Sequence, residues 1–150
     1  MKAITLWQPW ASLIAQGFKK IETRSWGTNY RGALLIHAAK RPIKAEDIDL
    51  YVRITNGQAL DLPLGKIVAA TKLSNCVEMS QEFIFKQSDL EIRCGDWREG
   101  RWAWELSEIV QVDIGIPVKG KQGLWVPNQG WKDEYSYLMK TNKCVVEKRI

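Results

Sequence analysis

A short segment near the N-terminus concentrates side chains that could do chemistry. Between Gly17 and Arg24 the chain carries two lysines, one glutamate and one arginine. The alternation of this segment predicts a strand on which Glu22 and Arg24 share one face, with Cα atoms roughly 6.5 Å apart. Glu22 is the only acidic residue among the first 44, and an acid among cations can accept from a base edge or orient its neighbours. A structural ion pair is the simpler interpretation on spacing alone.

A second candidate segment lies near the C-terminal end, from Lys119 to Trp125. Its two glycines let the backbone turn sharply and expose N–H groups, which suits an anion. Lys119 and Lys121 add positive charge, Gln122 adds an amide able to read a base edge, and Trp125 offers a stacking face. The alternative is a tight loop with Trp125 in the core.

Aromatic residues flank the first segment. The chain has eight tryptophans, and stacking on a ring or base is a common use of tryptophan outside the core. Trp7 and Gln8 precede a predicted helix and could face a cleft, whereas Trp10 lies on the apolar stripe of that helix. Trp26 and Tyr30 flank a loop and are candidate stacking residues.

Positive charge gathers at the two ends of the chain. The formal net charge is +5, divided as +7 over residues 1–44, −6 over 45–113 and +4 over 114–150. If the two ends meet, they form one basic face that attracts phosphate-bearing partners. Ordinary solvated surface lysines are the competing explanation.

The composition excludes several classes of function. A single histidine, His37, leaves no histidine-rich zinc site, and it is more simply a half-buried core residue than a general base. A magnesium site of carboxylates stays open on residue type, but no motif points to a metal or cofactor, and we expect none. No apolar run is long enough for a membrane span. Three dispersed cysteines without a CxxC motif favour reduced thiols and a cytoplasmic location.

Periodicity and turn signals predict short strands with few helices. The predicted strands are Lys2–Leu6, Lys19–Arg24, Arg31–Ala38, Lys66–Leu73, Trp102–Leu106, Val110–Ile116 and Cys144–Ile150. The predicted helices are Pro9–Gln16, a segment from Pro42 to Asn56-Gly57, a short helix near Ser80–Gln87, and Asp133–Lys140, with a loop over Ile54–Leu64.

The length of 150 residues predicts one domain over residues 1–150. Residues 74–101 are polar and mixed, and we expect them to be an insertion. Short strands with few helices indicate a mixed α+β fold, a small β-barrel with helices packed around it.

The run Gly17-x-Lys19-x-x-Glu22-x-Arg24 resembles the GxKxxExR signature of the ASCH domain family, in the PUA-like superfamily. The flanking runs Leu6–Ala11, Tyr30–Gly32 and Pro117–Trp125 are similar to larger members of that family. The resemblance implies a PUA-like barrel of about five or six strands with a cleft lined by the signature. It also implies RNA, or a modified nucleobase or nucleoside, as the ligand.

The resemblance leaves an enzyme as the alternative: a ribonuclease, or a hydrolase of the amidohydrolase kind acting on a modified nucleoside. Lys19 would then be the nucleophile or base, Glu22 an acid–base group and Arg24 an anion clamp. The small hydrolytic members of the family have a Lys-x-x-Thr motif, and in this chain Glu22 occupies the position of the threonine. A third interpretation is a protein-interaction module that uses the basic face.

Overall fold

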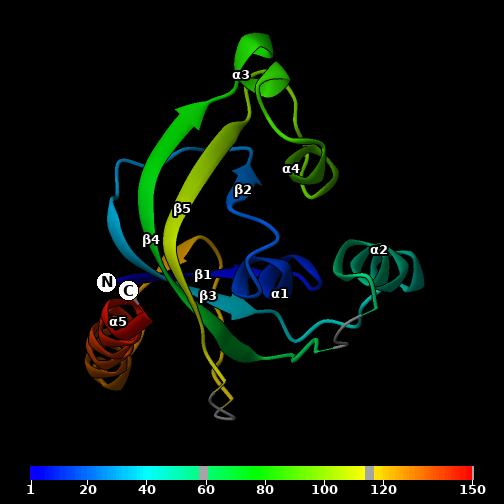
Figure 1. Ribbon diagram of the computed structural model, residues 1–150. Helices are drawn as coiled ribbons and strands as arrows, with labels where there is room; N and C mark the ends of the chain where they lie inside the picture. The colour runs from blue at the N-terminus through cyan, green and yellow to red at the C-terminus, as the bar shows by residue number, and fades with distance from the viewer. Residues whose placement is uncertain (58–60, 114–116, 150) are drawn as a thin grey trace.

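The computed structural model describes residues 1–57, 61–113 and 117–149, with 142–149 described as backbone only. Six strands form one curled sheet in the order β2-β5-β4-β3-β1-β6 (Figure 1). The strands are β1 Lys2–Leu6, β2 Ile21–Arg24, β3 Gly32–Ala38, β4 Lys66–Glu78, β5 Trp102–Gln111 and β6 Leu124–Trp125. Only the β1–β3 pair is parallel among these neighbours.

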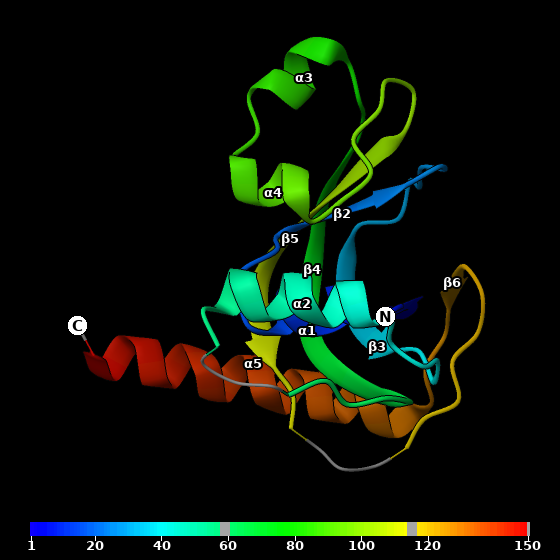
Figure 2. The ribbon, with the colours of Figure 1, turned by 90° about the vertical axis from the view of Figure 1, so that its right-hand side faces the viewer.

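Five helices accompany the sheet in the described part of the chain. They are α1 Trp10–Ala15, α2 Ala45–Thr55, α3 Gln81–Phe85, α4 Asp89–Arg93 and α5 Gln129–Arg149. Figure 2 shows α2 lying over α1 on one side of the sheet, with α5 on the other side. The predicted mixed α+β fold is confirmed, and the sheet forms a half-barrel rather than a closed one. No helix among the described residues is long and apolar enough to cross a membrane.

The two faces of the sheet bury separate apolar clusters because alternate residues of a strand point to opposite sides. Ile4 and Ile36 pack with α1 and Trp104 on one side. Leu35 packs on the other side against Trp131 of α5. Both faces of β3 are therefore covered.

The chain leads directly from β1 through α1 to β2, and this path positions the signature. Gln8 is buried, and its side-chain oxygen accepts the backbone N–H of Ser12 at 2.9 Å, which satisfies a donor in the first turn of α1. Leu13 and Ile14 of α1 are fully buried. Gly17 follows with a φ of +84°, a conformation that glycine adopts without steric cost, so the chain can turn towards β2.

Three predicted elements differ from the structure. Residues 144–149 continue α5 instead of forming a strand, and Ile150 lies outside the described residues. The β-branched pair Val145-Val146 favours a strand, but a helix satisfies its backbone hydrogen bonds internally and needs no sheet edge. The segments Trp102–Leu106 and Val110–Ile116 are joined in one strand that ends at Gln111, and 114–116 lie outside the described residues.

The polar segment that begins at residue 74 also contains regular structure. β4 continues to Glu78 and pairs with β5 from Asn75 to Glu78, so a polar sequence is held as strand by cross-strand backbone hydrogen bonds. The short helix predicted near Ser80–Gln87 is confirmed as α3. A second short helix, α4, follows, and the hydroxyls of Ser80 and Ser88 cap α3 and α4 respectively.

Candidate functional site

Two clefts adjoin between β1 and β2, strands that lie near opposite ends of the curled sheet. The first cleft has a volume of about 500 Å³ and the second about 1030 Å³. Thr5, Trp7 and Arg24 line both clefts. The two clefts are therefore adjacent, and these three residues mark their junction.

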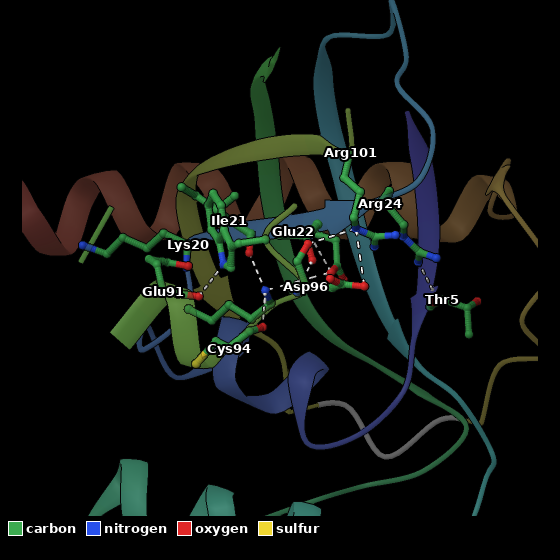
Figure 3. A network of polar contacts seen from close by, with 12 residues as sticks. Thr5, Lys20, Ile21, Glu22, Arg24, Glu91, Cys94, Asp96 and Arg101 are labelled. Atoms are coloured by element: carbon green, nitrogen blue, oxygen red, sulfur yellow. Dashed lines mark hydrogen bonds and ion pairs between the residues drawn. The ribbon is translucent and has the colours of Figure 1, made fainter. Parts of the chain in front are cut away.

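The first cleft is lined by charged groups from two distant parts of the chain. β2 contributes Glu22 and Arg24, whereas Arg93, Asp96 and Arg101 come from the end of α4 and the segment that follows it. Figure 3 shows Glu22 and Arg24 lying beside Asp96 and Arg101. Trp7 and Trp10 add indole rings to the same cleft. Acceptors, donors and apolar ring surface are thus present together.

Lys19 lies behind the first cleft and does not line it. It is fully buried, and its Nζ donates hydrogen bonds to the carbonyl oxygens of Ile21 and Cys94, the latter at 2.8 Å. Its Nζ also lies 3.9 Å from Glu22 Oε1. Lys19 therefore ties the start of β2 to the end of α4, and a ligand in either cleft does not reach its amine.

Glu22 sits between that buried lysine and the first cleft. Its side chain is 13% exposed, and its Oε1 accepts the backbone N–H of Thr23 at 2.9 Å. No hydrogen bond from the described residues involves its other carboxylate oxygen. Glu22 thus keeps an acceptor at the cleft while its position is fixed from behind.

Arg24 is only partly satisfied by the protein. Its Nη2 donates to the carbonyl oxygen of Thr5 at 3.1 Å. Its Nε is buried and has no hydrogen-bond partner among the described residues. No carboxylate among the described residues forms an ion pair with Arg24, so an uncompensated positive charge lies at the junction of the clefts.

Hydrogen bonds join α4 and the segment after it to β2 and to the residue that precedes β2. Glu91 Oε1 accepts the backbone N–H of Lys20 at 2.6 Å, and the backbone N–H of Asp96 donates to Thr23 Oγ1 at 3.0 Å. A Cβ on Gly95 would lie 2.8 Å from the Thr23 methyl group, so only glycine permits this close approach. These contacts fix the wall of the first cleft.

Asp96 is already paired with arginines. Arg98 donates two hydrogen bonds to its carboxylate, at 2.7 and 2.6 Å, and the Nε of Arg101 donates to its backbone oxygen at 2.9 Å. The hydrogen bonds from Arg98, together with the charge of Arg101, lower the pKa of Asp96. The negative charge of Asp96 is therefore largely offset, and Glu22 is the less compensated acid of the cleft.

The second cleft has a different electrostatic character. Arg24, Lys40, Lys119 and Lys121 line it, and no carboxylate is among its described lining residues. Trp7 and Trp26 supply aromatic surface. The cleft is therefore cationic without an acidic counterpart.

A chain of hydrogen bonds forms the floor of the second cleft. His37 is 2% exposed, and its Nε2 lies 2.6 Å from the carbonyl oxygen of Val118, which can only accept, so Nε2 carries the proton. The Nδ1 of His37 then accepts from Thr5 Oγ1 at 3.2 Å, and Trp125 Nε1 donates to the same hydroxyl at 3.2 Å. Burial lowers the pKa of His37, which favours this neutral form.

The structure brings together most of the residues that the sequence singled out. Those that line a cleft are Trp7, Glu22, Arg24, Trp26, Lys119, Lys121 and Gln122. Those that line neither are Gln8, Lys19, Tyr30 and Trp125.

Each of these last four has a structural task. Gln8 satisfies the first turn of α1, and Lys19 joins β2 to the end of α4. Tyr30 packs on the core and donates its hydroxyl to the carbonyl of Ala33 at 2.5 Å, and burial raises its pKa. Trp125 is buried under the second cleft, where its ring meets His37 edge-on at 5.8 Å.

Sequence reasoning missed the cleft residues Arg93, Asp96 and Arg101. They lie in the segment expected to be an insertion, whose mixed polarity hid them. The available signal was the Cys94-Gly95-Asp96 turn directly after a serine-capped helix, because such turns bring polar side chains to one end of an element. Lys40 and Thr5 were missed too, since nothing local distinguishes them.

Comparison with known proteins agrees with this architecture. A family model described as the ASCH domain matches residues 4–116. The chain is 29% identical over 150 residues to activating signal cointegrator 1 of Homo sapiens and of Mus musculus, covering 95% of this chain and 25% of each relative. The chain thus spans about a quarter of the length of the curated relatives it matches.

Solved structures show the same fold. The crystal structure of ASCH from Zymomonas mobilis has a TM-score of 0.55 and 16% identity, covering 90% of this chain and 93% of that one. A mutant of the same protein gives a TM-score of 0.55 at 15% identity, covering 90% and 96%. With the family match over three quarters of its length and this shared fold, the chain belongs to the ASCH domain family.

Proposed function

We propose that this domain binds RNA or a nucleobase-bearing ligand in the groove formed by the two clefts. The observation that carries the proposal is the lining of the first cleft, which brings together the ring of Trp7, the carboxylate of Glu22 and the guanidinium of Arg24. A nucleobase needs this combination, since its faces stack on rings and its edges mix donors with acceptors.

Trp7 is suited to stacking because one of its faces is already covered. Its side chain is 57% exposed, and the guanidinium of Arg41 lies 3.5 Å from the ring centroid. Trp7 lines both clefts and Arg41 lines neither, so the guanidinium supports the ring from outside the groove. A cation–π contact of this kind holds the indole in place.

Competition with a polyanion that has no bases distinguishes recognition of the base from simple attraction between charges. We expect a labelled single-stranded RNA to bind the domain at low salt, measured by fluorescence anisotropy, and heparin of matched charge to compete poorly. A panel of nucleosides and modified nucleosides, titrated by calorimetry, then identifies the base that the first cleft prefers.

Glu22→Gln tests the acceptor in that cleft. We expect its affinity for the preferred base to fall by about 1–3 kcal/mol, because one hydrogen-bonded edge is lost. Glu82→Gln is the matched control, since Glu82 is an exposed acid of α3 outside both clefts. If Glu22→Gln leaves every tested ligand bound as well as before, or better, the acceptor role is wrong.

No observation favours the alternative of a hydrolase based on Lys19. A nucleophile or base must reach the reacting atoms, and the amine of Lys19 is buried with two carbonyl acceptors. Mass spectrometry of the same RNA and nucleoside mixtures after incubation would reveal a product, and we expect none that depends on Lys19.

A further inference from the structure

We infer that the second cleft is a separate site for the phosphates of a single-stranded nucleic acid. One base of that strand is held in the first cleft, and the phosphates next to this base lie in the second. The inference rests on the proposed function and narrows its ligand from nucleobases in general to a strand. Its starting point is the contrast in charge: Glu22 and Asp96 line the first cleft, and no carboxylate lines the second. Phosphate is repelled by carboxylates and attracted by ammonium and guanidinium groups.

The lysines of the second cleft have no carboxylate partners among the described residues. Lys40, Lys119 and Lys121 are exposed, and none of them forms an ion pair with a carboxylate among the described residues. Arg24, at the junction, likewise makes only a hydrogen bond to a backbone carbonyl. An anionic ligand therefore meets four cations without first displacing an internal partner.

The loop that carries two of these lysines is fixed in place. Val118 donates its N–H to the carbonyl of Gly65 at 2.8 Å and accepts from His37 at 2.6 Å. Gly120 fits so closely on the floor that an added Cβ would lie 2.6 Å from Thr5 Oγ1. Lys119 and Lys121 flank this glycine, so their backbone is positioned before a ligand arrives, which reduces the entropy lost on binding.

The geometry favours a single strand over a duplex. A base reaches Glu22 and Arg24 inside the first cleft only when its edge is free and its ring has left the stack. Because Thr5, Trp7 and Arg24 belong to both clefts, the neighbouring phosphates pass directly into the second one.

Three probes separate a strand from its parts: the preferred nucleoside, inorganic pyrophosphate, and a labelled single-stranded RNA octamer that contains the preferred base. At about 50 mM salt we expect the octamer to bind at least tenfold more tightly than the nucleoside, and pyrophosphate to bind weakly. The slope of log affinity against log salt should be steep for the octamer and close to zero for the nucleoside.

The double variant Lys119→Ala/Lys121→Ala tests the second cleft. We expect it to lower octamer affinity roughly tenfold or more at low salt and to reduce the salt slope by about 1.4, at roughly 0.7 per lost phosphate contact. Nucleoside affinity should not change. Lys132→Ala/Lys140→Ala is the matched control, because it removes the same charge from α5, outside both clefts.

The outcomes distinguish this inference from the proposed function. If the octamer binds no better than the nucleoside, or if both double variants weaken it equally, the phosphate site is wrong while base binding stands. If pyrophosphate binds as tightly as the octamer, the cleft takes free phosphates and the inference is again wrong. If neither nucleoside nor octamer binds, the proposed function itself fails.

Discussion

The Nζ atom of Lys19 lies 3.9 Å from Oε1 of Glu22, yet the two groups occupy different surroundings. The ammonium is enclosed and donates to two backbone carbonyls, whereas the carboxylate lines the first cleft. The lysine of the signature therefore joins two segments of the structure, whereas the glutamate lines the first cleft. This division explains why a lysine and a glutamate three residues apart differ in accessibility.

Replacing the buried lysine should destabilise the fold. Lys19→Ala removes the donor to two carbonyls and leaves a cavity, and we expect the free energy of unfolding to fall by about 2–4 kcal/mol. Urea denaturation measures this loss. The neighbouring exposed residue is the control, since Lys20→Ala should change stability by less than about 0.5 kcal/mol. Equal stability of the two variants would show that Lys19 has no structural role.

Trp7 should matter for binding and little for stability. We expect Trp7→Ala to weaken the binding of single-stranded RNA by about 1–3 kcal/mol, the usual contribution of one base–aromatic stack. Because the side chain is 57% exposed, the melting temperature should shift only slightly. Tyr137→Ala, which removes an exposed aromatic ring from α5, should leave binding unchanged. Similar losses in both variants would contradict a stacking role.

Gly120→Ala should push the lysine loop away from the floor of the second cleft. The new methyl group would lie 2.6 Å from Thr5 Oγ1 and 2.7 Å from the His37 ring, and both partners are held by hydrogen bonds. Overpacking of this kind costs about 1–3 kcal/mol of stability. The melting temperature and the affinity for the RNA octamer should both fall.

The control for that substitution lies in α5, where Gly130 has ordinary helical geometry and its nearest neighbour is 3.4 Å away. Gly130→Ala should be neutral or slightly stabilising, since alanine favours helix. If Gly120→Ala behaves in the same way, the loop does not pack on the floor as described.

Stability should fall as the pH drops through the ordinary range of histidine. Burial lowers the pKa of His37, while the carbonyls of Val118 and Gly65 counteract part of that effect. The unfolded chain therefore binds a proton at a higher pH than the folded one, so stability is complete above about pH 6.5 and is lost on acidification. The slope reaches at most about 1.4 kcal/mol per pH unit.

The chain has one histidine, which makes this test clean. Urea titrations between pH 7.5 and 5.5 should show the slope in the native sequence and little of it in His37→Gln. A slope that survives the substitution would assign the effect to other groups. An opposite sign, with stability rising on acidification, would contradict a buried neutral imidazole.

Local sequence predicted the elements whose signals are complete within a few residues. Pro9, the apolar spacing of α1 and Gly17 define a short helix, and the doubly apolar β3 is recognisable because both its faces are buried. The signature Gly17–Arg24, with its runs at both ends of the chain, was sufficient to identify the family. Helix periodicity and turn chemistry depend on residues close together in the chain, so they can be recognised from the sequence alone.

The length of β4 and the helical structure of the C-terminal segment could not be predicted from local sequence. A polar strand such as Ser74–Glu78 exists because β5 pairs with it, and the valines of α5 are helical although their local preference is for strand. Propensity is a weak determinant when backbone partners elsewhere decide.

The role of each signature residue was likewise decided by the tertiary structure. One carbonyl that accepts a hydrogen bond from Lys19 belongs to Cys94, 75 residues away, and the carbonyl that accepts from His37 belongs to Val118, 81 residues away. The sequence by itself determined which charged and aromatic groups are available, and roughly on which elements they lie. Only the folded chain decided which of them are enclosed and which line a cleft, because burial and hydrogen-bond partners arise from contacts between distant segments.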